Sequence, residues 1–168
     1  SLVIDDGTDL RELLALARRY KTPLVEDDWG GELRFEGAEL PTLHALDGGR
    51  NVVYVSTFSK NLMPGLRVGW LVAPHPVLEH LVELKRIQDC GTSPLLQAAL
   101  HLFLDEGGLT THLQRVIPAY HERRDCMLQA MDRHFPEEVA RTRPEGGLFV
   151  WVTLPRNLDG EELFQAAQ

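Results

Sequence analysis

Lysine is scarce in this chain, although basic side chains are not. Of its 17 basic residues, three are lysines (Lys21, Lys60 and Lys85) and the other fourteen are arginines. An arginine side chain stays protonated in proteins, whereas a lysine amine loses its proton readily when it is buried. Lys60 closely follows an apolar run at residues 52–55, which favours a role that needs a neutral amine, such as imine formation with a carbonyl compound.

The sequence also lacks long apolar runs, closely spaced cysteines and an excess of positive charge. No apolar run approaches the roughly 18 residues of a spanning helix, and no secretory signal pattern opens the chain. Cys90 and Cys126 lie far apart, and we expect them to be small buried hydrophobic residues in a reducing compartment. The net charge of −8 argues against a nucleic-acid-binding face. We therefore expect a cytoplasmic protein that binds neither nucleic acid nor a membrane.

No metal site is expected, because the seven histidines do not have the spacing of metal ligands. We expect three of them, His112, His121 and His134, on the polar faces of helices. The chain has 168 residues, of which 43% are hydrophobic and 25% are charged. This is the composition of a globular domain that is large enough to bury a core.

Helical and strand-like apolar patterns alternate along the chain, which indicates an α/β fold. Asp9 with Glu12 resembles a capping box at the start of the first helix. Pro118 is expected to kink the longest helix, because proline removes an interior hydrogen bond. The expected helices are residues 9–20, 77–87, 93–105, 109–135 and 159–168, and the expected strands are 23–26, 51–56 and 67–73, with a hairpin of 139–143 and 148–154.

Candidate functional residues follow two of the expected strands. Hydroxyl groups stand three and one positions before Lys60, and an arginine stands seven positions after it; these are the donors that bind a phosphate. Asp27 and Asp28 end the upstream strand, and successive strand residues point to opposite sides, so one of them can face a ligand. An acidic pair of this kind also occurs in P-loop nucleotide hydrolases, but the Gly-x-x-x-x-Gly-Lys-Ser/Thr motif is absent.

Together, segments 25–35 and 56–72 resemble the pyridoxal-phosphate-dependent aminotransferases of fold type I, class I/II. The resemblance is to the 2-aminoadipate/aromatic transaminase type and to the aminotransferase-like domains of MocR (GntR-family) regulators. It extends from about Leu10 to the end of the chain, whereas residues 1–8 resemble nothing in the family. It implies a fragment, in which residues 1–106 are the later half of the large cofactor domain, with a three-layer, mainly parallel sheet. Residues 107–168 would be the long connecting helix and the start of the small α+β domain.

The resemblance also implies a role for each candidate residue. Lys60 would form the internal aldimine with pyridoxal 5'-phosphate and would then act as the general base and acid of transamination. Asp27 would pair with the pyridine nitrogen of the cofactor. The phosphate would be bound by Thr57, Ser59 and Arg67. Gly146-Gly147 resembles a segment that passes near the substrate, although a glycine turn before a core strand explains it equally well.

One departure from the family leaves the function open. Trp29 and Gly30 occupy the positions where the family has a tyrosine that donates to the ring hydroxyl of the cofactor. The first hypothesis is a transaminase for an α-amino acid and a 2-oxo acid, in which case the fragment itself need not be active. The second is the effector-sensing domain of a MocR-type regulator. The third is an inactive fragment whose unpaired strand edges cause association. A homodimer is expected in any case.

Overall fold

The computed structural model describes residues 9–168, which form two compact units. The first unit contains the residues up to Gly30 and Ala38–Thr111. The second contains Gly31–Gly37 and His112–Gln168. The short segment Gly31–Gly37 thus belongs with the C-terminal part of the chain, which the sequence pattern did not indicate.

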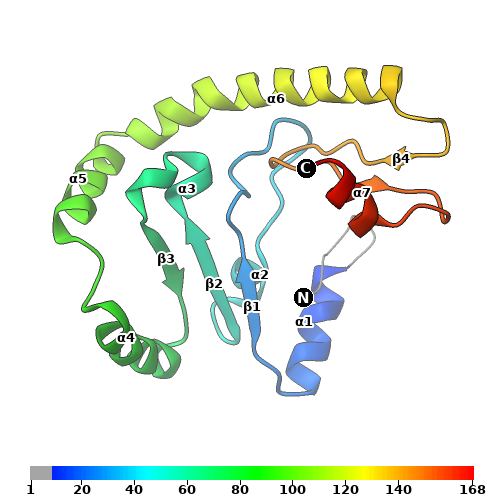
Figure 1. Cartoon of the computed structure of the whole chain (residues 1–168). Coiled ribbons are helices and arrows are strands. Elements are labelled where there is room, and N and C mark those ends of the chain that lie inside the picture. The colour runs from blue at the N-terminus through cyan, green and yellow to red at the C-terminus, as the bar shows by residue number, and fades with distance from the viewer. Residues whose placement is uncertain (1–8) are drawn as a thin grey trace. The chain divides into compact units, whose positions relative to one another are not determined.

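The first unit is built on a three-stranded sheet with the order β1-β2-β3 (Figure 1). The strands are β1 (Leu24–Asp27), β2 (Val52–Thr57) and β3 (Gly69–Val72). β1 runs parallel to β2, whereas β3 runs antiparallel to β2. The described sheet is therefore mixed rather than mainly parallel. The reason is the short connection of residues 58–68, because a parallel crossover requires about a dozen residues or more, usually with a full helix.

Two helices cover one face of this sheet. Leu14, Leu43 and Val52 form its buried core, and their side chains come from α1, α2 and β2. On the opposite face, Val25 is 70% exposed and Leu71 is 38% exposed. The described residues of the first unit thus do not show the expected three-layer arrangement. Its helices are α1 (Leu10–Arg19), α2 (Leu43–Asp47), α3 (Phe58–Asn61), the short 3-10 helix η1 (Pro64–Leu66), α4 (His75–Asp89) and α5 (Pro94–Asp105).

Side-chain caps define where α1 and α2 begin. Asp9 caps α1, since its carboxylate accepts a hydrogen bond from the Arg11 amide at 2.8 Å. The carboxylate of Glu26, on β1, accepts from the first two amides of α2, at 2.8 Å from Leu43 N and 2.9 Å from His44 N. These donors are otherwise unsatisfied at a helix start. Glu26 thereby attaches α2 to the sheet.

The second unit contains most of α6 (Gly108–His134), together with β4 (Ala140–Arg141), β5 (Val152–Thr153) and α7 (Gly160–Ala166). The expected hairpin is confirmed, but β4 and β5 pair over two residues each. Pro118 lies inside α6. Gly146 packs on the Gly31–Gly37 segment, because a Cβ atom there would lie 2.9 Å from the carbonyl oxygen of Leu33. Leu33 itself is fully buried.

One expectation about buried residues is wrong. Cys90 and Cys126 are exposed rather than buried. The expected helix at residues 77–87 exists as α4, but none of its residues is buried, and Ile87 is 83% exposed. Helical periodicity identifies an apolar stripe, but it does not show that the described chain contains the surface that covers it. Within residues 9–168, no helix combines the length and the apolar character needed to cross a bilayer.

Candidate functional site

The predicted site residues of β1 and β2 lie at one edge of the sheet. Asp27 is the last residue of β1, and Thr57 is the last residue of β2. Because these strands are parallel, their carboxyl ends meet at the same edge. Asp27 pairs with Val55, and residues two apart on a strand share a face. Asp27 and Thr57 are therefore on the same face of the sheet.

A pair of hydroxyl groups marks the turn from β2 into α3. Thr57 caps α3, since its Oγ1 atom accepts from the Ser59 amide at 3.1 Å. The hydroxyl oxygens of Thr57 and Ser59 lie 3.0 Å apart. Gly69 is opposite Thr57 on β3, where a Cβ atom would lie 3.0 Å from the carbonyl oxygen of Ser56. The backbone of β2 thus approaches Gly69 closely.

The basic residues of the motif are on the two short helices that follow β2. Lys60 lies in the single turn of α3, and Arg67 directly follows η1, which packs against α3. Arg67 has a left-handed backbone with φ of 52°. Both side chains are exposed. Burial of Lys60 would favour its neutral form, but the described residues do not enclose it.

The structure distinguishes the two adjacent aspartates. The carboxylate of Asp28 accepts a hydrogen bond from the Tyr54 hydroxyl at 2.7 Å. The Ser56 hydroxyl donates to the Asp28 carbonyl oxygen, also at 2.7 Å. Tyr54 and Ser56 are on the face of β2 that carries Val52, which is the face that α1 and α2 cover. Asp27 is exposed and on the other face.

Sequence reasoning missed Tyr54 and Ser56 as parts of this region. Burial, and after it the hydrogen bond to Asp28, raises the pKa of Tyr54 well above its usual range, so its hydroxyl stays a donor. A signal was present in the sequence, because these two polar side chains alternate with valines in an otherwise apolar strand. That pattern predicts one shared face, but it does not identify their partner.

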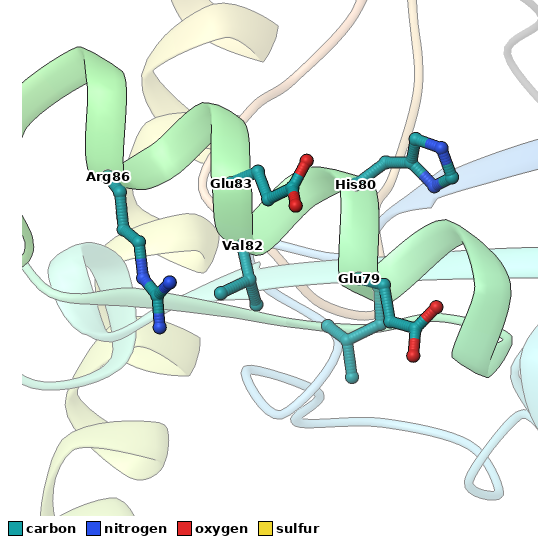
Figure 2. A pocket seen from close by; sticks show the side chains of 6 residues that line it. Glu79, His80, Val82, Glu83 and Arg86 are labelled. Carbon is teal, nitrogen blue, oxygen red and sulfur yellow. The ribbon is translucent and has the colours of Figure 1, made fainter.

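A surface hollow elsewhere in the first unit does not coincide with these residues. Figure 2 shows it along α4. None of the predicted site residues lines this hollow. The residues that line the hollow are Leu78, Glu79, His80, Val82, Glu83 and Arg86.

Within residues 9–168, no group of three or more His, Cys, Asp and Glu side chains is arranged to hold a metal ion.

Side chains at the ends of β1 and β2, and in the segment that follows β2, are of the chemical types that bind pyridoxal phosphate. Hydroxyl groups and a guanidinium suit a phosphate, and a carboxylate suits a protonated ring nitrogen. A lysine amine suits an aldehyde. These groups come from Asp27, Thr57, Ser59, Lys60 and Arg67, all within the first unit.

Comparison with known proteins identifies one family. Residues 6–168 match the family described as aminotransferase class I and II. The match begins at residue 6, so the expectation that residues 1–8 resemble nothing in the family is wrong for residues 6–8. Those residues lie outside the part of the chain that the structure describes.

Individual relatives include both enzymes and a regulator. The chain is 38% identical to aromatic-amino-acid aminotransferase 1 of Thermococcus litoralis, over 94% of this chain and 38% of the enzyme. It is 34% identical to the probable rhizopine catabolism regulatory protein MocR of Rhizobium meliloti, over 95% of this chain and 32% of that protein. The crystal structure of the alpha-aminoadipate aminotransferase LysN of Thermus thermophilus, complexed with N-(5'-phosphopyridoxyl)-L-leucine, superposes with a TM-score of 0.86 at 42% identity. That match covers 94% of this chain and 41% of LysN.

Proposed function

Because the chain belongs to the class I and II aminotransferase family, we propose that it is part of a pyridoxal-phosphate-dependent transaminase that acts on an α-amino acid and a 2-oxo acid. The observation that carries the proposal is the placement of Asp27 and Thr57 on one face, at the carboxyl ends of parallel strands, with the Ser59-Lys60 turn directly after them. The chain spans between about a third and two fifths of the relatives' length, so the activity of the whole protein is part of the proposal.

Each residue has a defined task in this proposal. Pyridoxal phosphate, when bound, supplies an electron sink for the charge that develops at the substrate Cα. Thr57 and Ser59 donate hydrogen bonds to the phosphate, and the Arg67 guanidinium offsets its charge. The Asp27 carboxylate accepts a hydrogen bond from the ring nitrogen and keeps it protonated. The Lys60 amine would hold the cofactor at its aldehyde group, and it would act as the base that takes the proton from the substrate Cα.

A sensing role in a MocR-type regulator is the second candidate. The observation that favours it is the pair Trp29-Gly30, which stands where the family has its tyrosine, together with the match to the MocR protein. An indole nitrogen differs from a phenol in reach and angle, so the ring hydroxyl of the cofactor would be held differently. The same residues would then serve to bind an amino acid with little turnover. A homodimer and a cytoplasmic location stay predictions under both candidates.

Covalent trapping tests the proposal. The purified chain would be incubated with pyridoxal phosphate, reduced with borohydride and digested, and the modified lysine would be located by mass spectrometry. We expect modification of Lys60 in the wild-type chain and its loss in Lys60→Ala. Lys85→Ala is the matched control, because Lys85 is on α4 and pairs with Asp89. Modification spread evenly over all three lysines, or none at all, would contradict the proposal.

A turnover assay separates the two candidates. The full-length protein would be supplied with an amino acid and a 2-oxo acid, and amino transfer would be followed by chromatography. Steady conversion supports the transaminase. Spectral change on amino-acid binding without conversion supports the sensing domain.

A further inference from the structure

Asp28 is held by β2 at three points. Its amide donates to the Val55 carbonyl oxygen at 2.9 Å, and its carbonyl oxygen accepts from the Ser56 hydroxyl at 2.7 Å. Its carboxylate accepts from the Tyr54 hydroxyl, also at 2.7 Å. Backbone and side chain of this residue are thus both fixed to the neighbouring strand.

Tyr54, whose hydroxyl contacts the Asp28 carboxylate, itself packs near other aromatic side chains. The Tyr54 ring has two aromatic neighbours, with ring centroids 6.0 Å from His44 and 5.1 Å from Trp70. A ring packed in this way has little rotational freedom, so its hydroxyl is presented to Asp28 in a defined direction. The high pKa of Tyr54 keeps this hydroxyl protonated over the physiological range.

This arrangement affects the preceding residue. Asp27 and Asp28 are adjacent, and successive side chains of an extended chain point to opposite faces. When Asp28 is held on the face of Tyr54, Asp27 must be on the face of Thr57. Without the Tyr54 hydroxyl, Asp28 would lose one of these hydrogen bonds to β2.

We propose that Tyr54 is a positioning residue, which acts through Asp28 to direct the Asp27 carboxylate toward the ring nitrogen of the cofactor. The proposal rests on the proposed function, since it requires a pyridine ring opposite Asp27. Tyr54 does not touch the cofactor in this scheme. Its effect should therefore depend on the ring nitrogen and not on the phosphate or the aldehyde.

Two ligands that differ at one ring atom test this idea. Dissociation constants of pyridoxal phosphate and of its deaza analogue, in which carbon replaces the ring nitrogen, would be measured by absorbance titration of the chain. Tyr54→Phe removes only the hydroxyl, and it should weaken pyridoxal phosphate about tenfold, as loss of a charge-assisted hydrogen bond does. The deaza analogue should bind to this variant as it does to the wild type. Asp27→Asn should give the same pattern, and Tyr20→Phe, at an exposed tyrosine, should change neither ligand.

Other roles of Tyr54, and a failure of the proposed function, would each give a different binding result. Equal weakening of both ligands by Tyr54→Phe would mean a purely structural role and would overturn the proposal, as would no weakening of either. A wild-type chain that binds neither ligand would overturn the proposed function itself. Amide hydrogen exchange at Asp28 would then decide on the attachment: exchange at least about tenfold faster in Tyr54→Phe than in Tyr20→Phe supports it, and equal exchange refutes it.

Discussion

Arg124 and Glu36 are 88 positions apart in the sequence, and their side chains are joined in the second unit by a hydrogen bond of 2.6 Å from Nη2 to Oε1. The Arg124 side chain is only 4% exposed and also donates to the Pro144 carbonyl oxygen at 2.7 Å. Glu36 accepts further from Arg143, at 2.5 and 2.9 Å, and its Oε1 atom lies 3.0 Å from Nε2 of His121. This cluster attaches the Gly31–Gly37 segment to α6.

The Glu36 cluster should make the second unit sensitive to acid. Hydrogen bonds from Arg124, and after it from Arg143, hold the pKa of Glu36 well below its usual range. A lowered folded-state pKa contributes stability that is complete above the unfolded value, near 4.5, and is lost as the pH falls below it. Glu36→Gln should therefore lower the unfolding temperature at pH 7 by roughly 2–8 °C, and by clearly less at pH 3.

Thermal unfolding followed by circular dichroism at the two pH values measures this difference. Glu39→Gln is the matched control, because Glu39 is an exposed carboxylate close by in the sequence. A Glu36→Gln effect of the same size at both pH values would show that its charge is not what stabilises the unit.

The carboxylate of Asp47 should stabilise the first unit through its hydrogen bonds. It is 2% exposed, and it accepts from Arg18 at 2.8 Å and from the amides of Arg50 and Asn51 at 2.9 and 2.5 Å. Burial alone would raise the pKa of Asp47, but these hydrogen bonds, from Arg18 first, outweigh burial and lower it. Asp47→Asn places an amide group among three donors, which should cost about 1–3 kcal/mol.

Urea unfolding at pH 7 would measure the Asp47 effect. Asp105→Asn, at an exposed position near the end of α5, should stay within about 0.5 kcal/mol of the wild type. If both variants unfold at the same urea concentration, the network around Asp47 does not stabilise the unit.

Arg67 tests the phosphate part of the proposed site. Arg67→Gln keeps much of the side chain but removes the charge, and it should weaken pyridoxal phosphate by roughly 10- to 100-fold, the size expected for a charge-assisted contact. Pyridoxal, which lacks the phosphate, should bind equally to both proteins. Fluorescence titration with the two ligands measures the ratio, with Arg50→Gln as an exposed control. Equal losses for both ligands would exclude Arg67 as a phosphate ligand.

Individual helices and strands could be predicted where the sequence pattern of a single segment was sufficient. The apolar spacing of Leu10 to Ala17 predicted α1, and the valine-rich run predicted β2. The spacing of the Lys60 motif identified the family, which the comparisons confirm. The direction of β3 was not predicted, although the short connection before it already argued against a parallel pairing.

The sequence alone determined the family, most of the helices and strands, and the placement of Lys60 directly after a strand. These properties depend on residues within a few turns of one another, and periodicity and motif spacing record them directly. The tertiary structure decided which of Asp27 and Asp28 is held by Tyr54, and it brought Glu36 to Arg124. Such contacts join residues that are tens of positions apart in the sequence. Sequence periodicity predicts the face of a helix or strand on which a residue lies, but it does not identify the distant residue that it contacts.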